Sequence, residues 1–393
     1  MSQAQLKENE QKYVMQTYSR FDLCLDHGQG CKLYDFEGKE YLDLTSGIGV
    51  NVLGHAHPAL TKALQEQVGT LMHTSNLYYT KPMVEAAEIL CLATGMDKAF
   101  FCNSGAEANE AMIKAARKYS QMNFGKDRTK ILTLKNSFHG RTIATLEATG
   151  QDKFHQYFFP YTSGFDYFTI NDMEDLKEKV DENTCGVMVE LIQGESGVQP
   201  LDPKFVKELE KFCHENDLLL LVDEVQTGIG RTGDLFCYQT YGIEPDIVSM
   251  AKALGGGVPI GGILANKRTS SALQKGDHGS TYGANPLATT AAKTVLSIVN
   301  NRDFLDEVRE KGAYFMEKLK SIDSEHIKEV RGIGLMIGIE VEPEHVLDYI
   351  QAAQDQGLLV LKAGTNTIRL LPPLIITKEE IDQAAQILKG VLQ

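Results

Sequence analysis

Asp223 and Lys252 are the two residues whose positions most clearly predict chemistry. Asp223 follows the uninterrupted apolar run Leu218–Val222, and Lys252 follows a second, similar segment, Asp246–Met250. Short apolar runs without alternation are typical of strands that are buried on both faces of a mostly parallel α/β sheet. Ligands of such sheets bind outside the carboxyl ends of the strands. We therefore expect this carboxylate and this amine to face one crevice.

Pyridoxal phosphate chemistry requires such a pair of side chains. A lysine holds the aldehyde of this cofactor as a Schiff base, and an acidic partner contacts the ring nitrogen. Asp223 would keep that nitrogen protonated, so that the ring can accept electrons. Lys252 must lose its proton to act as a nucleophile, which burial or neighbouring cations favour.

These segments also have other interpretations. A single Asp at a strand end is more often a cap or turn residue, and a single Lys is more often solvated. The segment Gly228–Gly233 also has the GxGxxG pattern of dinucleotide-binding proteins, which would indicate an NAD-dependent dehydrogenase. Asp223 and Glu224 would then place two negative charges beside a pyrophosphate, and no amphipathic helix is predicted after Gly233. A cofactor-binding protein without turnover, such as a regulator, is a third possibility.

The remaining sequence predicts the elements that position these residues. Strands are expected at 99–102, 130–134, 185–189 and 261–265, a crossover helix at 205–216, and a hairpin around Glu37–Lys39. A helix is expected to begin at Ser104–Gly105, where Ser104 and Glu107 match a capping box. A glycine turn into a helix N-terminus also presents free N–H groups to an anion. Two long helices are expected between 285 and 320, followed by short strands.

Composition limits the classes of protein to which the chain can belong. Its 393 residues predict two or three domains, and its net charge of −14 without a basic run disfavours nucleic acid and anionic membranes as partners. Seven cysteines without a CxxC pair, no visible targeting signal and no long apolar run predict a cytoplasmic protein. The His55-x-His57 pair lacks further ligands at a recognisable spacing, so no metal site is expected.

Three segments, Asp223–Gly228, Gly230–Gly233 and Ala251–Gly257, resemble the class III pyridoxal-phosphate aminotransferases, and the resemblance covers nearly the whole chain. It implies a fold-type I α/β enzyme whose large cofactor-binding domain, residues 54–279, contains a mostly parallel seven-stranded sheet. Residues 1–53 and 280–393 would together form a small α+β domain. The resemblance also implies a homodimer with shared active sites.

The same resemblance implies the residues of the site. Lys252 and Asp223 would be catalytic. The cofactor would be bound by Ser104, Gly105, Ala106, Phe138, Asp223, Glu224, Val225, Gln226, Lys252 and, from the neighbouring subunit, Thr281. The substrates would be bound by Arg141, Glu195, Ser280 and Arg369. The chain departs from the common family pattern at Ala106, where many relatives have Thr, and at Leu191 and Ser196.

The implied reaction is a ping-pong transamination. The expected donor is N-acetylornithine, through its distal amine, and the expected acceptor is 2-oxoglutarate. Ornithine, succinylornithine and 4-aminobutyrate remain alternative donors. Arg141 would bind the distal carboxylate of either substrate, and Arg369 the α-carboxylate of glutamate. Glu195 would cover Arg369 when acetylornithine is bound, because an unpaired buried charge costs several kcal/mol, in the ~3–5 range.

Overall fold

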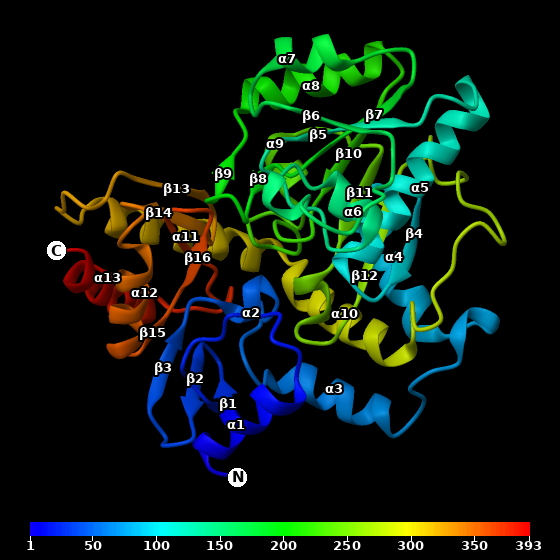
Figure 1. Ribbon diagram of the computed structural model, residues 1–393. Coiled ribbons are helices and arrows are strands. Elements are labelled where there is room, and N and C mark those ends of the chain that lie inside the picture. Colours follow the sequence, from blue (N-terminus) through cyan, green and yellow to red (C-terminus); the bar gives the residue numbers. More distant parts are fainter.

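A seven-stranded sheet forms the centre of the larger part of the molecule (Figure 1). The computed structural model describes all residues, 1–393. The strand order is β4 (Lys98–Cys102), β12 (Gly261–Ala265), β11 (Ile247–Met250), β10 (Leu219–Asp223), β7 (Thr184–Val189), β5 (Lys130–Leu134) and β6 (Phe165–Phe168). Strands β11, β10, β7, β5 and β6 pair in parallel, and β12 runs antiparallel to both of its neighbours. The predicted mostly parallel seven-stranded sheet is therefore confirmed.

Both faces of this sheet are buried, as the unbroken apolar runs predicted. Leu219 and Leu221 of β10 belong to a core cluster that includes Ala108 and Ala111 of α5 (Gly105–Phe124). Leu220 and Val222 of the same strand belong to the second, larger core cluster. This alternation follows from the twofold repeat of side chains along a strand. The sheet is accordingly a rigid platform whose strand ends can hold polar side chains.

Helices surround the large sheet. The helix α8 (Pro203–Glu215) packs on β10, α4 (Lys81–Thr94) packs on β4, and α10 (Pro286–Val299) packs against α3 (Pro58–Val68) and α4. Pro58 occupies the first turn of α3, where its missing N–H is not needed by the helix. Shorter elements complete this region, namely α6 (Ile143–Ala148), α7 (Met173–Lys179), α9 (Cys237–Tyr241), β8 (Ile192–Gln193) and β9 (Gln199–Pro200).

The two ends of the chain meet in the smaller part of the molecule, where blue and orange segments lie side by side in Figure 1. One sheet contains β1 (Leu25–Gln29), β2 (Lys32–Asp35), β3 (Glu40–Asp43) and β15 (Leu358–Leu359); the other contains β13 (Glu329–Ile333), β14 (Met336–Glu340), β17 (Thr367–Leu370) and β16 (Leu361–Ala363). The helices are α1 (Gln3–Tyr13), α2 (Ser46–Gly49), α11 (Arg302–Lys320), α12 (Val346–Asp355) and α13 (Lys378–Leu392). Segments from both chain ends thus form an α+β unit. No helix has the length and apolar character needed to cross a membrane.

The GxGxxG segment lies at the junction between these two parts. Arg231 is fully buried, and its Nη1 donates to the carbonyl oxygens of Leu335 and Pro372. Its Nη2 lies 3.5 Å from Ser46 Oγ. The next helix, α9, has five residues, and no long helix opens after Gly233. The segment therefore joins three distant parts of the chain, unlike a dinucleotide-binding turn, which leads directly into a helix.

Candidate active site

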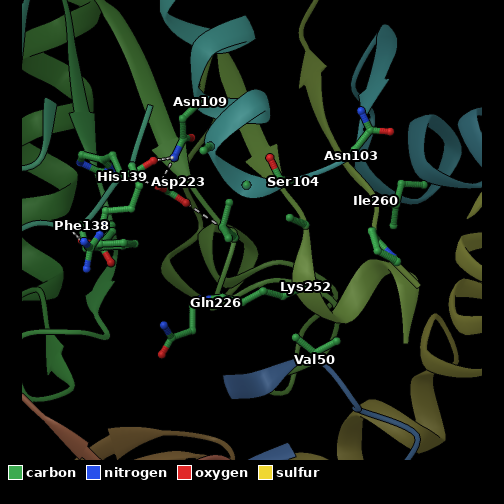
Figure 2. Close-up of a pocket in the computed structure, with 18 of the residues that line it drawn as sticks. Val50, Asn103, Ser104, Asn109, Phe138, His139, Asp223, Gln226, Lys252 and Ile260 are labelled. Carbon is green, nitrogen blue, oxygen red and sulfur yellow. Dashed lines mark hydrogen bonds and ion pairs between the residues drawn. The ribbon is translucent and has the colours of Figure 1, made fainter. Parts of the chain in front are cut away.

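A cavity of about 440 Å³ opens at the carboxyl ends of β10 and β11, in the size range of small-molecule sites. Asp223 and Lys252 both line it, as their positions after neighbouring strands predicted. Figure 2 shows them with Ser104, Asn109, Phe138, His139 and Gln226 around the same space. Of the predicted residues, the cavity is also lined by Gly105, Ala106, Arg141 and Val225.

Three donors hold the carboxylate of Asp223 in one orientation. Asn109 Nδ2 donates to Asp223 Oδ2 at 2.7 Å, and His139 Nδ1 lies 2.8 Å from the same oxygen (Figure 2). The backbone N–H of Val225 donates to the other oxygen, Oδ1, at 3.0 Å. Both oxygens therefore have fixed positions, and the side chain can act as an oriented acceptor or anion.

Lys252 is half-buried, and its surroundings favour loss of its proton. It follows β11 with a left-handed backbone, φ 41°, which is uncommon for a residue other than glycine. Burial lowers the pKa of the Lys252 amine, and the nearby guanidinium of Arg369 acts in the same direction, against the opposing effect of Glu195. A buried amine with a lowered pKa is a stronger nucleophile near neutral pH.

The N-terminus of α5 forms another wall of the cavity. Ser104 Oγ accepts from the N–H of Glu107 at 3.2 Å, which confirms half of the predicted capping box. The reciprocal half is wrong, because Glu107 Oε2 accepts from the N–H of Asn103 at 2.7 Å and not from that of Ser104. A Cβ atom on Gly105 would lie 2.7 Å from Val225 Cγ1, so only glycine allows this close approach. The first N–H groups of a helix have no partner within it, and they favour an anion.

Phe138 and Arg141 reach the cavity from the loop after β5. The N–H of Phe138 donates to Glu190 Oε2 at 2.8 Å, which fixes the loop against the end of β7. The Arg141 guanidinium lies over the rings of Phe154 and Phe138, at 4.2 and 5.6 Å from the centroids. Aromatic faces attract and orient a guanidinium without neutralising its charge. Arg141 is therefore positioned to receive an anionic group.

Glu195 and Arg369 form an ion pair at the edge of the site. Arg369 Nη1 donates to Glu195 Oε1 at 2.6 Å, across the boundary between the β8–β9 loop and β17. Burial raises the pKa of the Glu195 carboxyl, but the charge and hydrogen bond of Arg369, together with Lys252 and Gln226, outweigh this effect, so the pKa lies below its ordinary value. The structure thus brings together Glu195 and Arg369, the two residues for which the family resemblance implied a contact.

Five predicted residues do not line this cavity, namely Glu195 and Arg369 of the ion pair at its edge, and Glu224, Ser280 and Thr281. Glu224 is buried, and its carboxylate accepts from the N–H of Tyr238 at 2.7 Å and from the Thr227 hydroxyl. Burial raises the pKa of Glu224 to about 7. Ser280 and Thr281 line a separate hollow of about 750 Å³, where Thr281 is exposed. Ser280 Oγ accepts from Asn103 Nδ2 at 2.9 Å. Their roles stay predictions.

Asn109, His139 and Glu190 were not identified from the sequence as site residues. Asn109 follows Gly105 by one helical turn, so it shares the helix face that meets the cavity. This polar residue on a face of small residues was the available signal.

Burial raises the pKa of Glu190 to about 7; His139 lowers this pKa, and the charge of Asp223 raises it. Its position directly after an apolar strand, like that of Asp223, was the signal for Glu190.

A family model for class-III aminotransferases matches residues 13–392, and the chain belongs to this family. Among its relatives is the acetylornithine aminotransferase of Caldanaerobacter subterraneus subsp. tengcongensis, which is 50% identical over 385 residues, 98% of each chain. The ornithine aminotransferase of Toxoplasma gondii has a similar structure, with a TM-score of 0.96 and 30% identity, covering 100% of this chain and 95% of that one. The structure of the acetylornithine aminotransferase of Elizabethkingia anophelis has a TM-score of 0.89 and 32% identity. The match covers 100% of this chain and 99% of that one.

The residues present fit pyridoxal phosphate, the cofactor of this family. One cavity contains a helix N-terminus for a phosphate, an aromatic side chain for a ring and an oriented carboxylate for a ring nitrogen. It also contains the Lys252 amine, whose pKa is lowered, for an aldehyde. Each group of the cofactor thus has a chemically matched partner, as the protein must provide for this cofactor.

Proposed function

We propose that this aminotransferase moves the distal amino group of N-acetylornithine to 2-oxoglutarate, and so serves arginine biosynthesis. The similarity at 50% identity over 98% of each chain to an acetylornithine aminotransferase supports this donor. An ornithine aminotransferase of very similar fold is only 30% identical, so ornithine is the second candidate. Succinylornithine and 4-aminobutyrate are further alternatives.

The observation that carries the proposal is the contrast between two arginines. Arg369 is ion-paired with Glu195, whereas Arg141 contacts aromatic rings and lines the cavity. A donor with one carboxylate far from its reacting amine needs one free arginine and one covered arginine. Glutamate has two carboxylates and needs both arginines free. A guanidinium that can be covered or uncovered meets both requirements in turn.

Each residue has a defined task in this mechanism. When bound, pyridoxal phosphate supplies an aldehyde that takes up the amino group and a ring that accepts electrons. Lys252 would bind the aldehyde, and afterwards its Nζ would take a proton from the substrate carbon and return it. Asp223 would hold a proton at the ring nitrogen, and the N–H groups of Gly105 and Ala106 would bind the phosphate. Arg141 would orient the substrate through its distal carboxylate.

The remaining roles extend beyond one chain. We propose a homodimer in which Thr281 and Ser280 of one copy complete the site of the other. The exposure of Thr281 in a hollow outside the cavity supports this arrangement.

We also propose residues 54–279 as the cofactor-binding domain, with 1–53 and 280–393 as the small domain. The pairing of β15 with β3, from opposite ends of the chain, supports this division. Seven free cysteines support a cytoplasmic location.

A donor profile tests the proposed substrate. The purified enzyme is assayed with 2-oxoglutarate and each of N-acetylornithine, succinylornithine, ornithine and 4-aminobutyrate. We expect the highest kcat/KM with N-acetylornithine, by at least about tenfold over ornithine, whose free α-amino group adds a charge near Arg141. A higher kcat/KM with ornithine would contradict the proposal. Failure of every donor to turn over would favour a cofactor-binding protein without catalysis.

A further inference from the structure

One oxygen of Glu195 is held by two donors, and Arg369 is only one of them. Gln226 Nε2 donates to Glu195 Oε1 at 3.3 Å, the same oxygen that accepts from Arg369 Nη1 at 2.6 Å. Gln226 also closes the triangle, because its Oε1 accepts from Arg369 Nη1 at 3.2 Å. In Figure 2 the amide of Gln226 is turned away from Asp223. The amide thus contacts both members of the ion pair.

The two donors are buried and fixed, whereas the acceptor is partly exposed. Gln226 retains 7% and Arg369 2% of their full exposure, but the side chain of Glu195 retains 32%. A Cβ atom on Gly194 would lie 2.4 Å from Gln226 Oε1, so the amide is packed closely against the loop backbone. Of the three side chains, that of Glu195 therefore has the most space in which to rotate away from the other two.

The loop that bears Glu195 is anchored on both sides of this residue. Arg369 Nη1 donates to the Gly194 carbonyl at 3.0 Å, and the N–H of Gly364 donates to the Glu195 carbonyl at 2.7 Å. Arg331 Nη2 donates to the Gly197 carbonyl at 2.8 Å. With the backbone held in this way, departure of the Glu195 carboxylate requires rotation of its side chain alone.

Departure of Glu195 leaves a place prepared for another carboxylate. Arg369 Nη1 and Gln226 Nε2 converge on the position that Glu195 Oε1 occupies. Arg369 Nε is also buried without a hydrogen-bond partner, so the guanidinium has an unused donor. Donors held in place by packing bind an anion without further ordering cost. The carboxylate of Glu195 occupies this place as a substrate carboxylate would.

We propose that Gln226 is a specificity-determining residue that forms, with Arg369, a receptor for one carboxylate oxygen. Glu195 and the α-carboxylate of a dicarboxylic substrate are its alternative occupants. The inference rests on the proposed function and deepens it. The family resemblance implied only a cofactor-binding role for Gln226. An amide suits this task because it gives Arg369 an acceptor and gives the occupant a donor.

Binding of two matched ligands tests this receptor without turnover. Glutarate and pentanoate have the same carbon chain, but only glutarate carries a second carboxylate. Calorimetry on the cofactor-loaded enzyme should show tighter binding of glutarate. Gln226→Glu should reduce that preference by about 100-fold and Gln226→Met by about tenfold, because the first fills the receptor with a fixed carboxylate and the second removes one donor. Pentanoate lacks the second carboxylate, so its affinity in each variant is the reference from which the glutarate preference of that variant is calculated.

A rescue experiment provides the second arm. Glu195→Ala should slow the acetylornithine half-reaction in single-turnover absorbance, because Arg369 is left uncovered. Relative to Glu195→Ala alone, the double variant with Gln226→Glu should speed up the acetylornithine half-reaction by about tenfold. It should slow the glutamate half-reaction, because the new carboxylate occupies the receptor. An unchanged glutarate preference in both Gln226 variants, or no rescue, would overturn the receptor and leave the proposed function standing. No glutarate preference in the wild-type enzyme would overturn the glutamate site itself.

Discussion

At the scale of single residues, the site depends on groups whose protonation is set by their neighbours. Asp223 accepts hydrogen bonds from Asn109, His139 and the N–H of Val225, so its orientation does not depend on the cofactor. Lys252 lies in the same cavity with a lowered pKa. One carboxylate that is oriented as an acceptor and one amine that is ready to lose its proton are the two requirements of this chemistry.

Replacing Asp223 by Asn should remove the charge and keep the shape. We expect kcat to fall by at least about 100-fold, because a neutral amide cannot hold a proton on the ring nitrogen. The cofactor should also dissociate faster, which dialysis followed by absorbance measures. Asp223→Glu, which retains a carboxylate, is the matched control and should keep more activity than the amide. Near-normal turnover of the Asn variant would contradict the role of Asp223.

Glu224 gives a pH dependence of stability. Its pKa in the native state is about 7, against an ordinary value of 4.5. Between these values the native state holds the proton and the unfolded state does not, so the free energy of unfolding falls as the pH rises. This loss is at most about 3 kcal/mol and is complete above pH 7. Below pH 4.5 the effect is absent.

Glu224→Gln should therefore gain stability relative to the wild-type enzyme as the pH rises. We expect the difference in Tm, variant minus wild type, to be about 3 °C larger at pH 8 than at pH 5. Thermal unfolding followed by circular dichroism at both pH values measures it. A difference that does not change with pH, or that shrinks, would show that Glu224 is ionised in the native state throughout.

At the scale of elements, the sequence predicted the central strands best. Strands 130–134 and 261–265 have the predicted bounds, because their short, mostly apolar runs end where the buried strand ends. The carboxyl ends of parallel strands then brought Asp223 and Lys252 together. These features depend on local patterns and on the general geometry of α/β sheets, both of which are visible in one sequence.

The contacts that the sequence did not predict join distant segments. Asn109 and His139 precede Asp223 by 114 and 84 positions, and Arg231 precedes its carbonyl acceptors by 104 and 141. No periodicity connects such pairs, because their proximity results from packing of the whole chain. The partner of Glu107 was wrong by one residue for a local reason, because the turn before α5 brings the N–H of Asn103 to its carboxylate.

The N-terminus of α5 offers a test that depends on a single hydroxyl group. Ala106→Thr would supply the hydroxyl that many relatives have, next to the proposed phosphate. We expect cofactor binding to tighten by about fivefold, because one more hydrogen bond reaches an anion. Ala106→Val has the same shape without the hydroxyl and should not tighten binding. Equal affinities of the Thr and Val variants in equilibrium dialysis would place the phosphate elsewhere.

At the scale of the whole molecule, the site joins the large sheet to the smaller unit that both chain ends form. The small unit supplies Arg369 on β17, and the large sheet supplies Lys252 and Asp223. Hydrogen bonds connect the two parts: the N–H of Gly364 donates to the Glu195 carbonyl, and buried Arg231 donates to the Leu335 carbonyl. We expect the second copy to supply Thr281.

Mixed dimers test the sharing of sites. Lys252→Ala and Thr281→Ala enzymes, each with little activity, are unfolded, mixed and refolded together. A hybrid has one site with both lesions and one site with neither, so random mixing should recover about a quarter of the wild-type activity. Mixing two samples of the same variant is the control. A mixture no more active than its parents would mean that Thr281 acts within its own subunit, or not at all.

The central claim, transfer of the distal amino group, can be followed by an isotope. N-acetylornithine labelled with ¹⁵N only in its distal amine is incubated with 2-oxoglutarate and the enzyme, and the glutamate formed is analysed by mass spectrometry. The account predicts that the glutamate carries ¹⁵N, one label for each molecule of aldehyde product. Unlabelled glutamate, or consumption of the donor without formation of glutamate, would contradict it.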